Sequence, residues 1–273
     1  MSKVETVTRE THEYFEGDDL ATNVFVTKYA LRDKQGDFHE TNPNDMHIRL
    51  ATEFARMEDK FGGNQLTKET IFNNIKGFKK IVPQGSPMFG IGNDFVKVSL
   101  SNCVVVDSPQ DNISSIVDSG KDLANLFKRR CGVGLDISDL RPEGAIVSNS
   151  AGTTTGAWSF ADFYSYVCRM VGQNGRRGAL MISMDVRHPD IEKFIKMKQD
   201  LTKVTGANVS VKISDDFMEA VEKGEKFTLQ FPVGAIHPKT TLEIDAVELW
   251  NQIIESATTT AEPGILMWDN ITK

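Results

Sequence analysis

The sequence predicts an α/β protein in which a helical N-terminal region, residues 1–95, precedes a largely parallel sheet with its covering helices, residues 96–273. Two observations support this division. Before residue 87, apolar residues recur at helical spacing between charged ones. After it, short apolar runs alternate with amphipathic stretches, which is the pattern of repeated βαβ units. A chain of 273 residues can bury a sizeable core, as one large domain or as two smaller ones.

The N-terminal region contains two stretches with clear helix start and stop signals. Asn44 or Asp45 is expected to cap the first helix, because a short polar side chain can accept a hydrogen bond from an amide of the first turn. Thr67 is expected to open the second helix. The lysines at 79–80 would lie in its last turn, before Pro83 stops it. Both are interpreted as packing helices.

The second region is predicted to alternate strands with helices. Strands are expected near residues 96–106, 132–137, 179–184, 208–213, 227–231 and 264–268. Helices are expected near residues 113–129, 158–171, 188–199, 214–223 and 245–261. Because ligand sites in such sheets gather where strands end and loops begin, unusual residues at those places are the candidates for chemistry.

Charge and cysteine usage exclude several functional classes. With 31 Lys and Arg against 38 Asp and Glu, the net charge of −7 disfavours a nucleic-acid polymer as partner, although local arginines and helix N-termini can still bind small anions. Met1–Arg9 is polar, and no run of about eighteen apolar residues occurs, so neither secretion nor a membrane span is expected. The 3 cysteines form no CxxC motif and no metal-ligand cluster, which favours a reducing, cytoplasmic location and no bound metal.

Residues 100–106 place a lone thiol, Cys103, beside polar residues in a run that otherwise has the pattern of a buried strand. A cysteine in such a run is most often a small buried hydrophobic residue, and the same interpretation applies to Cys131 and Cys168. The polar neighbours of Cys103 make a redox or radical role the alternative.

Three glycine-containing segments each allow two interpretations. Gly132 and Gly134 follow a basic helix end and indicate either a helix stop before a strand or a nucleotide contact. Residues 175–178, Gly-Arg-Arg-Gly, form either a solvated turn or a loop that offers two guanidinium groups to a phosphate or a base edge. Residues 152–156 form either a flexible polar loop or an ordered loop that contacts an effector.

Four segments, in this order and spacing, resemble the large catalytic subunit of ribonucleotide reductases: residues 100–106, 129–134, 140–145 and 172–179. The resemblance extends over residues 20–60 and 83–270. It implies that residues 96–273 form the first half of a ten-stranded α/β barrel. It also implies a ribonucleoside-diphosphate reductase, which forms deoxyribonucleotides by thiyl-radical chemistry.

The resemblance further implies roles for single residues. Cys103 would be one half of the thiol pair that becomes a disulfide at each turnover. The substrate's phosphates and sugar would be held at Ser86, Ser101, Asn102, Cys131 and Gly132. An allosteric deoxynucleotide would be bound, and its identity relayed, by Asp111, Arg141, Gln173, Asn174, Arg176 and Arg177. Cys131 departs from the small Gly or Ala expected at its position.

The family's second thiol, its thiyl-forming cysteine and its Asn and Glu acid–base residues all follow the segment that resembles residues 264–268. A split enzyme is therefore expected, inactive alone and completed by a complementary C-terminal half. An engineered or proteolytic fragment is the alternative. The completed subunit is expected to dimerise and to be reduced by a thioredoxin- or glutaredoxin-type protein, and an ATP-cone domain is not expected within the first ninety or so residues.

No covalently bound cofactor is expected, but a dNTP or ATP effector with Mg²⁺ is. The radical source would lie outside this chain, as a metal-containing small subunit, which we slightly favour, or as adenosylcobalamin. The alternative function is a non-catalytic nucleotide-sensing or assembly module with the same half-barrel fold. Cys103 with Asn102 and Ser101 argues against it, because a pure sensor has no chemical use for them.

Overall fold

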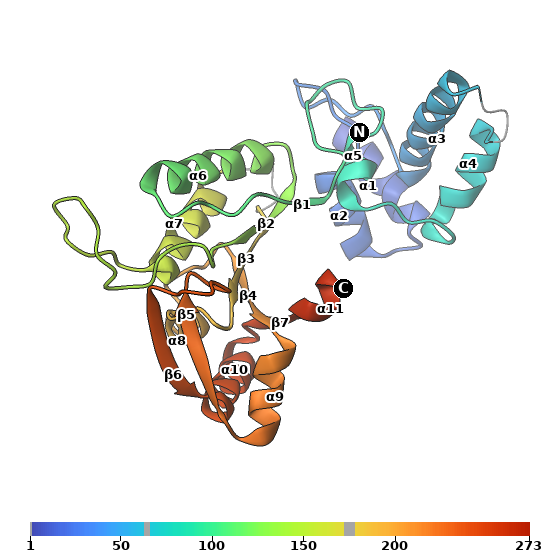
Figure 1. The fold of residues 1–273 in the computed structure, drawn as a ribbon. Helices are drawn as coiled ribbons and strands as arrows, with labels where there is room; N and C mark the ends of the chain where they lie inside the picture. The colour runs from blue at the N-terminus through green and yellow to red at the C-terminus, as the bar shows by residue number, and fades with distance from the viewer. Residues whose placement is uncertain (1, 63–65, 172–177) are drawn as a thin grey trace. The chain divides into compact units, whose positions relative to one another are not determined.

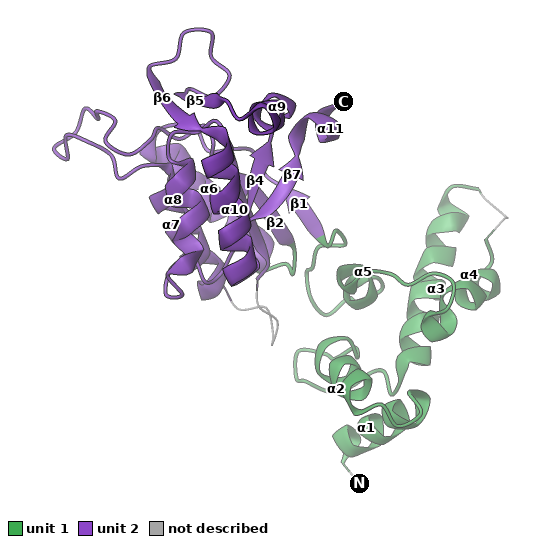
Figure 2. Cartoon of the chain, turned by 90° about the horizontal axis from the view of Figure 1, so that it is seen from below, with its two compact units in different colours: residues 1–102, 128–131, 172–176 green, residues 103–127, 132–171, 177–273 purple. Residues whose placement is uncertain are grey.

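The computed structural model describes residues 2–62, 66–171 and 178–273. The chain divides into two compact units, which Figure 2 shows in different colours. Unit 1 comprises residues 1–102, 128–131 and 172–176, and unit 2 comprises residues 103–127, 132–171 and 177–273. The predicted domain boundary after residue 95 remains a prediction, because compactness alone does not define a domain.

Unit 1 is helical, as predicted. Its helices are α1 (Lys3–Tyr14), α2 (Asp19–Lys28), α3 (Pro43–Lys60), α4 (Lys68–Ile75), the 3-10 turn η1 (Lys76–Phe78) and α5 (Gly85–Gly90).

The predicted N-cap of α3, Asn44 or Asp45, is wrong by two or three residues. Asn42 is the cap, and its Oδ1 accepts a hydrogen bond from Asn44 N at 2.9 Å. Pro43 occupies the first helical position, where a missing N–H costs nothing and the fixed φ suits a helix. Asn44 and Asp45 therefore lie inside the first turn.

The helix α4 begins as predicted but ends early. The Thr67 hydroxyl accepts a hydrogen bond from Thr70 N at 3.2 Å, which confirms the predicted cap. The helix stops at Ile75 because Gly77 takes a left-handed φ of 67°, which a helix cannot continue through. The lysines at 79–80 consequently lie beyond the helix.

A buried histidine distinguishes the small apolar core of unit 1. His47 is 0% exposed, and its ring lies edge-on to Phe78 with centroids 4.7 Å apart. Neither ring nitrogen has a hydrogen-bond partner among the described residues. Burial lowers the pKa of His47 to about 4, so the ring is neutral near neutral pH and packs as an aromatic group.

Unit 2 is built on a five-stranded parallel sheet in the order β1, β2, β3, β4, β7 (Figure 1). Its strands are β1 (Cys103–Val105), β2 (Gly132–Asp136), β3 (Leu180–Asp185), β4 (Asn208–Ile213) and β7 (Gly264–Met267). The predicted α/β class, a helical N-terminal region followed by a largely parallel sheet, is therefore confirmed.

Two strand predictions are wrong in detail. β5 (Lys226–Phe231) pairs antiparallel with β6 (Thr240–Asp245), which was not predicted, and the two form a separate sheet. The connection over residues 232–239 is too short for the crossover that parallel pairing needs. β1 covers only three of the residues predicted at 96–106, because part of the preceding segment is held within unit 1, where Ser99 N donates to Arg129 O at 2.8 Å.

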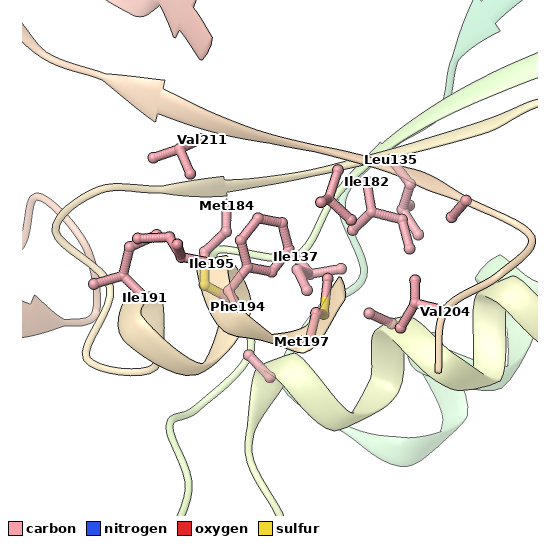
Figure 3. Packing of buried hydrophobic residues seen from close by; sticks show 14 of the residues in the cluster. Leu135, Ile137, Ile182, Met184, Ile191, Phe194, Ile195, Met197, Val204 and Val211 are labelled. Atoms are coloured by element: carbon pink, nitrogen blue, oxygen red, sulfur yellow. The ribbon is translucent and has the colours of Figure 1, made fainter. Parts of the chain in front are cut away.

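Four helices cover one face of the five-stranded sheet (Figure 2). They are α6 (Ile113–Phe127), α7 (Ala157–Met170), α8 (Ile191–Lys196) and α10 (Ala246–Thr260). Figure 3 shows part of the apolar packing between strands and helices. Of the remaining helices, α9 (Asp215–Lys223) packs against α10 and β5, and α11 (Trp268–Thr272) follows β7 and contacts β4.

Successive side chains of a strand point to opposite faces, so the sheet has two chemically distinct surfaces. The helix-covered face carries Val133, Leu135, Leu180, Ile182, Met184, Val209, Val211 and Ile213, all buried. The other surface, here called the opposite face, carries Cys103, Gly132, Gly134, Asp136, Met181, Ser183, Asp185, Ser210 and Lys212. Candidate chemistry in the sheet is therefore confined to one side.

Candidate functional site

Cys103 begins β1 and lies on the opposite face, in parallel register with Gly132 of β2. Its side chain is exposed, so the interpretation as a small buried hydrophobic residue is wrong for this cysteine. The neighbouring strand carries glycines at 132 and 134, of which Gly132 is buried and Gly134 is half-buried. A ligand can therefore approach the sulfur.

The other two cysteines are packing residues. Cys131 and Cys168 are 1% and 2% exposed. Burial raises the pKa of the Cys168 thiol to about 11, which keeps it protonated and unreactive near neutral pH. Of these three cysteines, Cys103 alone has an exposed thiol.

A polar cluster that the sequence did not indicate lies at the carboxyl ends of β2, β3 and β4. Asp136 Oδ2 accepts a hydrogen bond from Ser183 Oγ at 2.7 Å and lies 3.1 Å from Lys212 Nζ. Lys212 Nζ also lies 4.7 Å from the ring centroid of Trp268. Asp185 is opposite Lys212 in register, and burial raises its pKa. In the sequence, each of these three strands carries one charged residue near its end, which did not by itself indicate a cluster.

The predicted substrate residues fall in both units. Ser86, Ser101, Asn102 and Cys131 belong to unit 1, and Gly132 belongs to unit 2. Within unit 1, Ser86 is 0% exposed; its N–H donates to Asn102 Oδ1 at 2.9 Å, and its hydroxyl donates to Arg130 O at 3.1 Å. Ser101 is exposed. The fold therefore brings Ser86 beside Asn102 and beside the residue that precedes Cys131.

Arg130 holds this part of unit 1 together, although no sequence pattern indicated it. Its guanidinium lies 3.7 Å from the ring centroid of Phe89 and donates to Lys28 O at 3.3 Å. The residue has a positive φ of 65°, an uncommon conformation for a side chain of this size. Arg130 fixes the main chain that accepts the Ser86 hydroxyl.

The structure brings together two residues predicted to bind an effector, Asp111 and Arg141, which lie 30 positions apart in the chain. Asp111 Oδ1 accepts from Arg141 N at 3.1 Å and from Arg141 Nε at 2.9 Å, and Oδ2 accepts from Nε at 2.7 Å. The guanidinium also donates to Asp111 O at 3.1 Å and to Ile146 O at 3.0 Å. Arg141 is thereby oriented by Asp111 and by its own loop.

These two residues line a pocket of about 340 Å³. The loop over residues 141–156 supplies part of the wall, through Val147, Ser148, Asn149 and Thr154. This loop is a hairpin in which Gly144 N donates to Thr154 O at 3.0 Å and Val147 N donates to Gly152 O at 3.0 Å. Both interpretations of residues 152–156, a flexible polar loop and an ordered loop that contacts an effector, remain predictions.

Gln173, Asn174, Arg176 and Arg177 lie outside the described residues, so their predicted relay role stays a prediction.

A second pocket, of about 750 Å³, lies between the end of β1 and α6. Its lining includes Asp107, Asp118 and Asp122 together with several serines. In the described part of the chain, no three His, Cys, Asp or Glu side chains are arranged to hold a metal ion. No helix among those residues is both long and apolar enough to cross a membrane.

Comparison with known proteins places this geometry in context. Residues 101–273 match the family model "Ribonucleotide reductase, barrel domain", a span that includes the whole five-stranded sheet and Cys103. The vitamin B12-dependent ribonucleoside-diphosphate reductase of Thermoplasma acidophilum is 31% identical over 207 residues, which are 74% of this chain and 26% of that protein. The Mycobacterium tuberculosis protein of the same description is 29% identical over 260 residues, covering 93% of this chain and 36% of the relative.

A relative of another description is the ribonucleoside-diphosphate reductase large chain of Neurospora crassa, 27% identical over 221 residues, which are 72% of this chain and 24% of that protein. The chain thus spans about a quarter to a third of the length of these relatives.

Proposed function

The chain belongs to the ribonucleotide reductase large-subunit family, and from that premise we propose that its sheet contributes to the reduction of ribonucleotides to deoxyribonucleotides. The observation that carries the proposal is the exposed thiol of Cys103, beside the glycine backbone of β2. Exposure is necessary for a thiol that is oxidised and reduced again at each turnover.

The proposed role of Cys103 is that of a reductant. Removal of the substrate's 2′-hydroxyl as water requires two electrons and two protons. Two thiols supply both when they become a disulfide, so one ribonucleotide and two thiols give one deoxyribonucleotide, one disulfide and one water. Cys131 and Cys168 are buried, which favours a second thiol contributed by another part of the completed barrel. The radical that starts the reaction would come from a further cysteine there.

The substrate and effector roles follow as further proposals. Ser86, Ser101, Asn102 and the backbone at 131–132 would bind the substrate's phosphates and sugar. The partly buried hydrogen bond from Ser86 N to Asn102 Oδ1 supports the grouping of Ser86 with Asn102. The 340 Å³ pocket beside Asp111 and Arg141 would bind a dNTP or ATP effector with its Mg²⁺. Arg177 and its neighbours would relay the effector's identity.

Completion of the sheet by other strands is proposed because both edge strands expose apolar side chains. Val105 of β1 is 85% exposed, and Ile265 and Met267 of β7 are 43% and 42% exposed. Further strands, from a complementary polypeptide or from more of the same one, would cover them.

Dimerisation of the completed subunit is proposed to use α6 and α7. Ile113 of α6 and Met170 of α7 are 68% and 62% exposed, which supports it. The isolated chain is expected to be inactive.

The radical source is proposed to be adenosylcobalamin rather than the small subunit slightly favoured from sequence, because the first relatives reported above are described as vitamin B12-dependent. Adenosylcobalamin supplies a radical when its cobalt–carbon bond breaks. No described residue is assigned to hold it. A thioredoxin- or glutaredoxin-type protein would then reduce the disulfide.

The test is turnover by this chain reconstituted with the remaining barrel strands, a radical source and a dithiol. Cys103→Ser should abolish multiple turnover while leaving assembly intact. Cys168→Ser is the matched control, because it alters a buried thiol in α7 and should retain activity. Wild-type multiple turnover by Cys103→Ser would refute the proposed role of the thiol.

A further inference from the structure

The turn that follows β3 consists of His188, Pro189 and Asp190, and none of the roles proposed above uses it. His188 and Asp190 are 0% and 5% exposed, which is unusual for ionisable side chains. Their contacts lead to the loop over residues 141–156, part of which lines the 340 Å³ pocket.

The Asp190 carboxylate binds both ends of that loop. Oδ1 accepts a hydrogen bond from Glu143 N at 3.0 Å, and Oδ2 accepts from Ala157 N at 2.9 Å. Asp190 occupies the N-cap position of α8 but makes no side-chain cap there. It caps α7 instead, at Ala157, where the helix dipole favours a negative charge. One carboxylate thus closes the base of the loop.

His188 anchors a third point of the same base. Its Nδ1 accepts a hydrogen bond from Asp190 N at 3.0 Å, and its Nε2 donates to Leu140 O at 2.8 Å. Because Nδ1 accepts from an N–H, the ring is the neutral form with its proton on Nε2. Burial lowers the pKa of His188 and keeps it neutral. The turn therefore also holds Leu140, the residue directly before Arg141.

The close approach of the loop to Asp190 requires a glycine. Gly156 has a φ of 92°, and a Cβ there would lie 2.4 Å from Asp190 Oδ2 and 2.7 Å from Glu143 N. Glu143 is held from its other end as well, since its carboxylate accepts from Trp158 Nε1 at 2.9 Å and pairs with Lys193. The contacts converge on one rigid base rather than on the loop's tip.

We propose that Asp190 is a positioning residue for the effector pocket: by holding Glu143 and Ala157 together, it fixes the loop residues that face Asp111 and Arg141. The proposal rests on the proposed function for the nature of the ligand. A simple helix cap would bind only the start of α7, whereas the same carboxylate also binds the far end of the loop. Loss of Asp190 should therefore affect ligand binding beyond the loss of one cap.

The first measurement is amide hydrogen exchange of the full chain, which needs no ligand. Asp190→Asn should speed exchange at Gly144, Val147 and Thr154 by about tenfold or more, because one charge-assisted bond at the loop base is lost. Asp245→Asn is the matched control: Asp245 Oδ1 accepts from Glu248 N at 2.9 Å and caps α10, far along the chain from the loop. That variant should leave exchange in the loop unchanged.

A second variant perturbs the same contacts without changing a charge. Gly156→Ala should produce the same loss of protection, by steric conflict with Asp190. Gly224→Ala is its control, since Gly224 also has a positive φ, 66°, but no described atom lies within 4 Å of the position its Cβ would take. This pair keeps the proposal testable if Asp190→Asn fails to fold.

The second measurement is calorimetric titration of each of the four deoxynucleoside triphosphates into the full chain and its variants. Asp190→Asn and Gly156→Ala should weaken binding about tenfold or more, and Asp245→Asn and Gly224→Ala should not. Unchanged exchange in the loop would overturn the proposal, and so would faster exchange with unchanged affinity. If the wild-type chain bound none of the four, the proposed effector pocket would fall, while the exchange measurement would still decide whether Asp190 holds the loop.

Discussion

The two faces of the five-stranded sheet share one backbone but differ in chemistry. On the helix-covered face, Ile182 and Val211 are 0% exposed and lie in a continuous apolar core. On the opposite face, adjacent positions of the same strands carry Met181, 37% exposed, and the charged Lys212. The alternation of a β-strand therefore separates stability from candidate chemistry by one residue.

This difference explains why polar residues can occupy the opposite face without loss of the core. The packing of helices on one face supplies the burial that folding requires, at roughly 25 cal/mol for each Å² of apolar surface. The opposite face is then available for a thiol and an Asp–Lys pair. Variants at neighbouring positions of one strand can test this separation directly.

The largest expected effect is at Ile182. Ile182→Ala should lower the free energy of unfolding by roughly 2–5 kcal/mol, because it leaves a cavity in the packed core. Met181→Ala, one residue earlier on the other face, should cost less than about 1 kcal/mol. Urea denaturation of the full chain, followed by circular dichroism, measures both. Equal losses would show that the opposite face is packed as tightly as the helix-covered face.

Thiol reactivity should separate the faces next. Cys103 is exposed on the opposite face, whereas Cys168 lies in the core with a pKa raised to about 11 by burial. In the native chain, iodoacetamide should modify Cys103 about 100-fold faster than Cys168, since a buried thiol reacts only after local unfolding. Peptide mapping by mass spectrometry measures both rates. Cys103→Ser should remove the fast reaction, and equal rates in the wild type would contradict the assignment.

Much of the fold could be predicted because the central strands are buried on their helix-covered face and rich in apolar residues. β2, β3 and β4 lie close to their expected positions, with boundaries within a residue or so. β6 could not be predicted, since its side chains are nearly all exposed and lack apolar alternation. The direction in which β5 pairs also depends on a distant segment, which a local pattern does not contain.

The candidate site was partly predictable for a different reason. Cys103 is noticeable in sequence because a thiol stands beside polar residues in an apolar run. The assignment of Asp111 and Arg141 to one effector site came only from the family resemblance, and their direct pairing was not predicted, since contacts across 30 positions leave no local signal. The Asp136–Lys212 pair was missed, because a single charge in a short strand is indistinguishable from an exposed edge position. Only the register of neighbouring strands brings those two charges together.

The smallest expected effect distinguishes two carboxylates on the opposite face. Asp136→Asn should lower stability by roughly 1–3 kcal/mol near neutral pH, because Lys212 loses its ion partner. Asp185→Asn should instead be as stable as the wild type or more so. Burial is the main cause of the raised pKa of Asp185. Among the described residues its carboxylate accepts one hydrogen bond, from Arg187 N, which an asparagine oxygen can also accept.

The pH dependence of Asp185→Asn fixes the sign of this effect. The folded pKa of Asp185 lies above its ordinary value of 3.8, so as pH rises the unfolded chain releases this proton first. The free energy of unfolding of the wild type therefore falls as pH rises from 3.8 through the folded pKa. Asp185→Asn has no carboxyl group there and does not show this decrease. The advantage of the variant should grow as pH rises through the folded pKa and vanish below about pH 3, where Asp185 is protonated in both states. Chemical denaturation of the two proteins across this range measures it. A variant less stable than the wild type at neutral pH, with the gap closing in acid, would mean that attraction to Lys212 outweighs the burial of Asp185.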